Sequence, residues 1–403
     1  MKSDIEPYLR SMGLALTGRD GGSCSAFSEA DWIAWAEIAK REGLAPLLYH
    51  AQESTGWPLA IPGRERQALR KEYLKAGGSN LLIYRELARV LAALQVAVPR
   101  APLILLKGAA LATTIYSEIA LRPMTDVDIL LSREHLESAV EALRFLGYGD
   151  LSPEMTPGLS RETHFEVALK GGPRGYVIVE LHWRLIGGEG DWRSPRLDWF
   201  WGQTQAWELK DERRQSPPLS ALQFRPTAHL LYLAAHLMLQ HGGAKGRLLW
   251  VHDIHLLVRK CEPDLDWDEL KVRAREYGWS PALRSALLRA QDIFDTPLPE
   301  GFLDALSADG VPKTRAAVEN RAQSVQTRGT MIWHRMRSLD WPRRLKLARS
   351  VLWPTPEYLC WRYSLRRKWL WPLYYPYRWA LLSLECAKTL AKLSWSRLGY
   401  TQA

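Results

Sequence analysis

Two aspartates, Asp126 and Asp128, stand two residues apart in an apolar run that reads DVDILL. Residues two apart on a β-strand point to the same face, so the two carboxylates would project together while Val127, Ile129 and Leu131 face a core. Adjacent carboxylates repel each other, and the pKa of one of them rises unless a cation neutralises the pair. Oxygen ligands suit Mg²⁺, which keeps several waters and binds substrate phosphates. The spacing therefore predicts a Mg²⁺ site for a phosphorylated substrate.

The residues before this strand could hold that phosphate. An apolar run at 103–106 ends in Lys107-Gly108, and Arg122 follows the helix-like stretch that comes next. We expect Gly108 to let the backbone approach a phosphate, with the free N–H groups and positive dipole end of the helix beside it. Lys107 and Arg122 would neutralise phosphate oxygens. The predicted order is strand, glycine turn, helix, then the strand with paired carboxylates.

A third acid lies on a later strand. Segments 162–169 and 176–182 are strand-like and are joined by a glycine-rich turn, which predicts a hairpin. Glu180 and His182 share one face of the second strand. Because the neighbours of Glu180 are apolar and a buried acid needs a partner, we expect it to complete a triad with the two aspartates. The alternatives are a solvent-exposed acid for Glu180, and phosphate binding or packing beneath the site for His182.

The segment LLKGAALATTIYSEIALRPMTDVDILL resembles the core of the polymerase-β-like nucleotidyltransferase superfamily, and more closely a bacterial family of uncharacterised nucleotidyltransferases. The likeness rests on the LKG turn, the short helix and the R-P-M-x-D-x-D strand. It extends to a helix ending in Gly147-Tyr148 and to an acid followed by Leu-His-Trp at 180–183. It covers roughly residues 30–271. The superfamily usually has Gly-Ser or Gly-Gly at the turn, where this chain has Lys107-Gly108-Ala109.

This resemblance implies a reaction in which a substrate hydroxyl or phosphate attacks the α-phosphate of an NTP and pyrophosphate leaves. Asp126, Asp128 and Glu180 would hold two Mg²⁺ ions, and Glu180 would position the acceptor and act as base. The residues expected to bind the nucleotide are Lys107, Gly108, Ala109, Arg122 and His182. The acceptor is not identified: a peptide, a sugar, a small metabolite or RNA would each serve.

We expect an α/β (α+β) fold in which a small mixed-sheet core is flanked by N-terminal helices and a C-terminal helical domain. The expected divisions are a helical segment at 1–100, the catalytic core at 101–225, a helical domain at 226–330 and a basic, Trp-rich extension at 331–403. Within the first segment, residues 64–96 predict one long helix or a broken one, with Gly77-Gly78 as the expected break.

Two other functions remain open. HD-type phosphohydrolases bind metals with histidines, a His-Asp pair and a later aspartate, and the helical region offers such residues: His229, His236, His241, His252-Asp253, Asp292 and Asp295. Their alternative role is to line or cap buried helices. The second possibility is a non-catalytic binding or scaffold protein that has kept the nucleotide pocket. The presence of all three acids favours catalysis over this one.

The basic charge is concentrated in the C-terminal extension. Residues 331–403 hold 14 Lys and Arg against three acids, a net charge of +11. The whole chain has a net charge of +10, so the other residues together have a net charge of −1. Eight of the 19 Trp alternate there with basic residues, a composition typical of segments that prefer an anionic membrane surface. Helices packed through their Trp residues are the alternative. Nothing resembles a sequence-reading DNA motif.

The cysteines and the N-terminus indicate the compartment. The four Cys form no C-x-x-C pair, so they predict neither a disulfide framework nor a zinc site. The N-terminus lacks the apolar core of a signal peptide, and no apolar run approaches the length of a membrane span. We expect a cytoplasmic protein, and peripheral membrane contact is one of the two alternatives for the extension.

Overall fold

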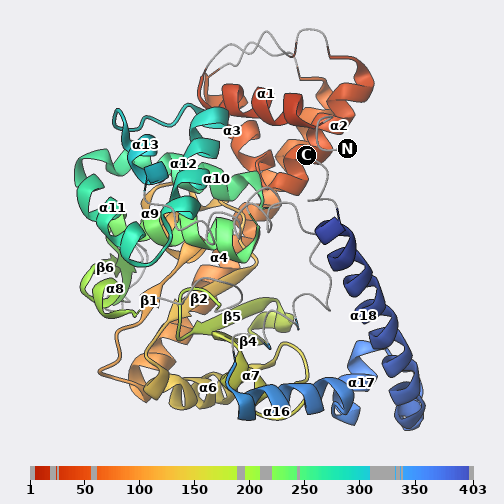
Figure 1. Ribbon diagram of the computed structural model, residues 1–403. Helices are drawn as coiled ribbons and strands as arrows, with labels where there is room; N and C mark the ends of the chain where they lie inside the picture. Colours follow the sequence, from red (N-terminus) through yellow and green to blue (C-terminus); the bar gives the residue numbers. More distant parts are fainter. Residues whose placement is uncertain are drawn as a thin grey trace.

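The structure is a computed structural model of the 403-residue chain. It describes residues 5–18, 24, 27–55, 61–187, 196–208, 220–242, 246–308, 332, 336 and 339–398. Its centre is one seven-stranded mixed sheet with helices on both faces (Figure 1). This confirms the predicted fold class.

The strands lie in the order β3-β4-β5-β2-β1-β7-β6. Their bounds are β1 Ile104–Leu105, β2 Asp126–Leu130, β3 Gly149–Asp150, β4 Glu166–Gly171, β5 Val177–His182, β6 Thr204–Glu208 and β7 Ser220–Phe224. The β2–β5 and β1–β7 pairs are parallel, and the other neighbouring pairs are antiparallel. The hairpin of β4 and β5 is confirmed. The predicted start of its first strand at residue 162 was wrong, because Leu159–Thr163 forms helix α7.

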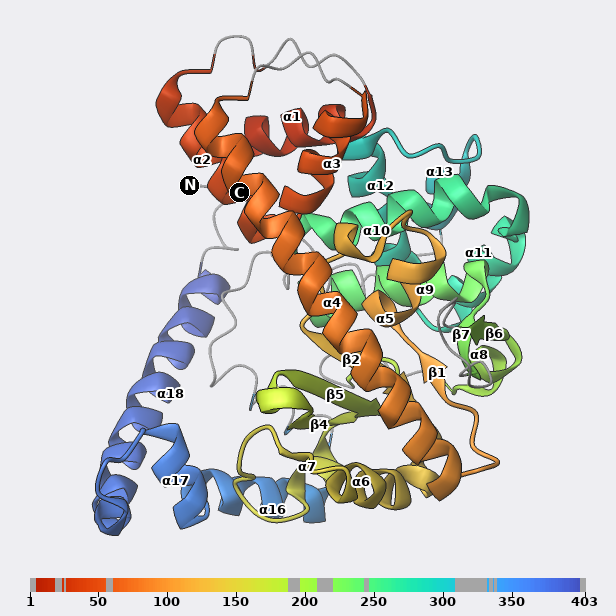
Figure 2. The same cartoon turned by 180° about the vertical axis from the view of Figure 1, so that it is seen from behind.

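Helices α4 (Gly63–Ala97) and α6 (Leu136–Phe145) cover one face of the sheet (Figure 2). Val127, Ile129 and Leu131 point into that core, as their spacing predicts. Leu130 instead belongs to the larger core on the other face. Because side chains alternate along a strand, Asp126 and Asp128 also point to that other face.

The second face lies against the C-terminal helical domain. Its helices are α9 Pro226–Ala235, a π-helical turn at His236–Gln240, α10 Leu248–Cys261, α11 Trp267–Glu276, α12 Ser280–Phe294 and α13 Phe302–Ala308. The N-terminal helices α1 Glu6–Leu16, α2 Glu29–Glu42 and α3 Ala45–Thr55 join the same hydrophobic core. The helical segment expected at 1–100 and the helical domain expected at 226–330 therefore share one hydrophobic core. Of the second, residues 309–330 lie outside the described residues.

The C-terminal extension packs beneath the sheet domain through its first helix. The helices there are α16 Trp341–Leu352, α17 Pro356–Arg362, the short η8 Lys368–Leu373 and α18 Tyr374–Leu398. Leu347 and Val351 of α16 bury Leu159 of α7, and the Thr156 and Ser350 hydroxyls lie 2.7 Å apart. Helix α18 then runs along the edge of the molecule (Figures 1 and 2). Among the helices of the described part, none combines the length and apolar character needed to span a bilayer.

Helix α4 is continuous over 35 residues, so the predicted break at Gly77-Gly78 was wrong. A Cβ added at Gly78 would meet no atom within 4 Å, whereas at Gly77 it would lie 3.3 Å from the Cβ of Ala120. Packing of the helix against the segment after α5 (Lys107–Thr114) thus outweighs the low helix propensity of two glycines, about 1 kcal/mol each.

We expect Gly78→Ala to raise the free energy of unfolding by about 1 kcal/mol, because alanine costs less than glycine in an exposed helix interior. Gly77→Ala should gain less, because its Cβ must displace Ala120 slightly. Urea denaturation followed by circular dichroism measures both. A destabilised Gly78→Ala variant would contradict the continuous helix.

Candidate functional site

The carboxylate of Asp128 lies between two cationic side chains on the sheet face beneath the helical domain. Its Oδ1 is 2.7 Å from Nζ of Lys107 and 2.9 Å from Nε2 of His182. Asp128 is 2% exposed and His182 is fully buried. A buried carboxylate without such partners would be strongly destabilising, so Lys107 and His182 make this position of Asp128 possible.

Strand pairing brings two glutamates to the same place. The parallel register of β2 and β5 sets Glu180 beside Asp128, and the antiparallel register of β4 and β5 sets Glu166 opposite His182. Oε2 of Glu180 is 3.6 Å from Nε2 of His182, and Oε2 of Glu166 is 3.3 Å from its Nδ1. The imidazole therefore has a carboxylate on each side, although its contact with Glu166 lacks hydrogen-bond geometry.

Lys107 reaches Asp128 from an unusual backbone conformation. Its φ is +46°, in the left-handed region that residues other than glycine rarely adopt. Such strain persists only where the surroundings hold it, and it is concentrated at functional sites. In this chain Lys107 is the first residue of α5, and its ion pair with Asp128 fixes the turn.

The charges in the cluster set one another's protonation. Burial alone would raise the pKa of Asp128, but the neighbouring Lys107 and His182 hold it well below its usual range. Burial opposes the charge of His182, yet the carboxylates of Asp128 and Glu180 raise its pKa to about 9. Burial also raises the pKa of Glu166, with a smaller contribution from the charge of Glu180.

Asp128, Glu180 and His182 each offer a ligand atom, and these atoms lie within 4.8 Å of one another. Two carboxylates and one imidazole fit a divalent cation. Among the described residues, no other group of three His, Cys, Asp or Glu meets this condition. Asp126 lies outside the group, but its charge interacts with Asp128 and Lys107, and burial raises its pKa. The side chains of Lys107, Glu180 and Glu166 are 16%, 19% and 26% exposed, so the cluster reaches solvent through these three residues.

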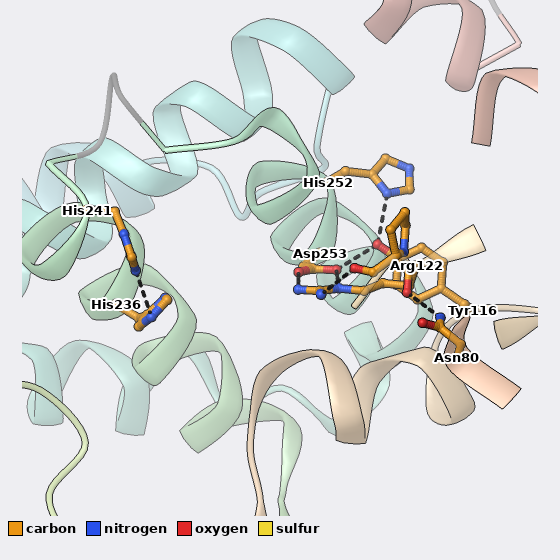
Figure 3. A network of polar contacts seen from close by, with 8 residues as sticks. Asn80, Tyr116, Arg122, His236, His241, His252 and Asp253 are labelled. Carbon is orange, nitrogen blue, oxygen red and sulfur yellow. Dashed lines mark hydrogen bonds and ion pairs between the residues drawn. The ribbon is translucent and has the colours of Figure 1, made fainter. Parts of the chain in front are cut away.

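Arg122, expected to bind phosphate, has a partner in the helical domain. Its Nη2 donates to Oδ2 of Asp253 at 2.8 Å and its Nε to Oδ1 at 3.3 Å (Figure 3). A Cβ on Gly108 would lie 2.6 Å from Nη1 of Arg122, so the glycine is needed for this guanidinium to pack. The contribution of Arg122 and Gly108 to nucleotide binding stays a prediction.

Helix α4 positions the segments that carry the site. Nδ2 of Asn80 donates to the backbone oxygen of Arg122 (Figure 3). It also donates to the backbone oxygen of Ile119, and Oδ1 of Asn80 accepts from the N–H of Met124 at 3.2 Å. The hydroxyl of Tyr84 donates to the backbone oxygen of Ala109 in α5. The turn before β2 and the helix after Lys107 are therefore both tied to one rigid element.

The His252-Asp253 pair belongs to the hydrogen-bond network around Arg122. The hydroxyl of Tyr116 donates to Oδ1 of Asp253 at 2.6 Å, so its oxygen must accept from Nδ1 of His252 at 3.2 Å (Figure 3). Burial lowers the pKa of His252 to about 3 and keeps the ring neutral. Because Asp253 is neutralised by Arg122, this arrangement favours a structural role over the phosphohydrolase hypothesis.

Two participants were missed from the sequence. Glu166 reaches the cluster through strand register, which the sequence does not display. Tyr232 of α9 is fully buried, and its hydroxyl has no hydrogen-bond partner among the described residues. Burial raises its pKa, while the charge of Lys107 lowers it and that of Asp128 raises it. The π-helical turn that follows contains His236, whose Nε2 lies 3.1 Å from that of His241 (Figure 3). Such turns occur often at functional sites.

A groove lies elsewhere on the protein, away from the carboxylate cluster. It has a volume of about 1730 Å³ and runs between α4, the end of α5 and β6, and its lining includes Tyr84, Arg85, Arg89 and Trp207. None of Asp128, Glu180 and His182 lines it. We place the site at the carboxylate cluster because buried charge with strained backbone indicates chemistry more directly than volume does.

A mixed sheet that carries paired carboxylates and is flanked by helices is consistent with a nucleotidyltransferase-like core. Comparison with known families matches residues 28–295, more than half of the chain, to the family described as uncharacterised nucleotidyltransferase. The chain belongs to this family. No curated protein and no solved structure matches it.

We expect Asp253→Ala to lower the free energy of unfolding by about 3–5 kcal/mol, because it leaves Arg122 buried without its counter-charge. The double variant Arg122→Met/Asp253→Leu should recover most of this loss, since apolar residues replace both charges. Asp150→Ala, which breaks the exposed Arg144–Asp150 pair, is the control and should cost less than about 1 kcal/mol. Equal stability of Asp253→Ala and the control would contradict the tie between sheet and helical domain.

Proposed function

We propose that the protein transfers a nucleotidyl group from an NTP to an acceptor hydroxyl, with a divalent metal ion, Mg²⁺ in the first instance. The observation that carries the proposal is the placement of Asp128, Glu180 and His182 within 4.8 Å of one another, beside Lys107. Membership of a family described as nucleotidyltransferases supports the reaction class. The relation to the wider polymerase-β-like superfamily rests on the sequence resemblance.

The charge balance of the cluster supports a cationic ligand. Asp126, Asp128, Glu166 and Glu180 bring four carboxylates, against the single positive charges of Lys107 and His182. A bound divalent cation would offset most of this excess and polarise the phosphate to be transferred. Asp128, Glu180 and His182 would hold one ion, and His182 would bind as the neutral imidazole. Asp126, on the same sheet face as Asp128, would serve the second ion that the sequence predicts.

The protein's own groups then have distinct tasks. Lys107, at the start of α5, would turn from Asp128 to the triphosphate, where its charge stabilises the departing pyrophosphate. Glu180, partly exposed beside Asp128, would take the proton of the acceptor hydroxyl. A bond forms between the acceptor oxygen and the α-phosphorus as the bond from that phosphorus to the pyrophosphate oxygen breaks. Tyr232, whose hydroxyl has no partner in the described part, would contact the acceptor from the helical side.

A non-catalytic nucleotide-binding protein is the second candidate. The specific observation in its favour is that Lys107 and His182 already compensate Asp128, as they would in a pocket that no longer binds metal. The two functions differ in one property, because only the enzyme breaks the bond between the α- and β-phosphates.

We expect Asp128→Asn to lower Mg²⁺-dependent transfer of label from α-³²P-NTP by at least about a hundredfold, since it removes charge from the centre of the cluster. Peptide, sugar, metabolite and RNA fractions serve as acceptors, each of the four NTPs is tried, and γ-³²P-NTP is run in parallel. The matched control is Asp150→Asn, the same substitution on β3, where the side chain is half exposed.

Transfer of the γ-label alone would contradict nucleotidyl transfer and indicate a kinase. Nucleotide binding by the parent without transfer of either label to any fraction would favour the non-catalytic candidate. If Asp128→Asn transferred label as well as Asp150→Asn does, the carboxylate cluster would not be the active site.

A further inference from the structure

The junction between α17 and α18 exposes an unusual density of large apolar side chains. This junction, residues 361–377, is called the tip surface here, and it lies at the edge of the molecule far from α1 and α12 (Figures 1 and 2). Trp369 is 69% exposed and Leu373 67%, and Trp361 and Tyr377 are half exposed. Single exposed apolar residues are ordinary, but four of them within 17 residues, on elements that pack against one another, indicate an interaction site.

The same surface carries only positive charge. Arg362, Arg366, Arg367 and Lys368 are all exposed, and residues 361–377 include no Asp or Glu. In the described part of the chain, none of these four side chains forms an ion pair. Four cations without counter-charges, set among tryptophans, match an anionic surface with an apolar layer beneath it.

The tip surface is ordered by its own contacts. The ring of Tyr363 lies 5.1 Å from that of Tyr374, the hydroxyl of Tyr375 donates to the backbone oxygen of Pro354, and the buried Arg378 donates to that of Val351. These contacts fix the backbone that carries the exposed Trp369 and Leu373. Binding of a partner to the tip surface therefore requires little ordering of the chain. Such preorganisation favours affinity.

We propose that the tip surface docks the protein peripherally on an anionic lipid membrane. Trp369 and Leu373 would enter the boundary between headgroups and acyl chains, and the four cations would contact lipid phosphates. A lipid surface suits the apolar residues better than a nucleic acid does, because Leu373 gains nothing from a phosphate backbone. This inference is independent of the proposed reaction, since none of its residues lies in the carboxylate cluster.

The test uses the full-length protein and sedimentation with vesicles of phosphatidylcholine alone or mixed with phosphatidylserine, at low and high salt. We expect binding to the mixed vesicles only, weakened by salt. Trp369→Ser/Leu373→Ser should lower it by at least about tenfold through lost apolar burial. Arg366→Gln/Arg367→Gln should lower it roughly 25-fold, about fivefold for each charge.

Two control variants match these changes outside the tip surface. Trp341 at the start of α16 is also 69% exposed, so Trp341→Ser removes an equally exposed ring. Arg343→Gln/Arg344→Gln removes two adjacent charges from the same helix. Both controls should bind vesicles like the parent, and nucleotide binding should be the same in all variants.

Three results would overturn the proposal. Equal binding to neutral and anionic vesicles would exclude the charge recognition. Equal losses in the tip and control variants would place the contact elsewhere on the extension. Complete displacement from mixed vesicles by single-stranded RNA, with tighter binding to that RNA than to lipid, would show that the surface recognises a polynucleotide.

Discussion

The structure depends on one buried carboxylate and the two cations that make its burial possible. Asp128 accepts from Lys107 and His182 at 2.7 and 2.9 Å while almost fully removed from water. Removing both partners would leave an uncompensated charge in a low-dielectric interior, which proteins rarely tolerate. The left-handed backbone of Lys107 and the register of β2 with β5 accompany the approach of these two partners to Asp128.

A second buried ion pair extends the constraint to the helical domain. Arg122 precedes β2 by four residues and pairs with Asp253 of α10, and Asn80 of α4 holds the backbone on either side of the same turn. The face that carries Asp128 is therefore fixed against the helices that bring Tyr232 over it. The site is rigid because the links come from three separate parts of the chain.

The sequence predicted the local order well and the long-range partners poorly. Period-two spacing places Asp126 and Asp128 on one face, because alternation is a property of the strand itself. The partner of Arg122 is 131 residues away, and the approach of Glu166 depends on register, so neither is visible locally. Gly77-Gly78 predicted a break because propensity acts within the helix, whereas packing against distant residues decided the outcome. Strands β6 and β7 were not predicted, because their sequences, TQAWE and SALQF, contain few β-branched residues.

In the proposed reaction, the Asp128 cluster would exchange the Lys107 ammonium for a divalent cation when nucleotide binds. A crystal structure with Mn²⁺ and an NTP analogue that cannot be cleaved between its α- and β-phosphates tests it most directly. We expect an anomalous Mn²⁺ peak within bonding distance of Asp128, Glu180 and His182, with Nζ of Lys107 moved onto the triphosphate. Nucleotide bound in the groove between α4 and β6, with the Lys107–Asp128 contact intact and no Mn²⁺ beside Asp128, would contradict it.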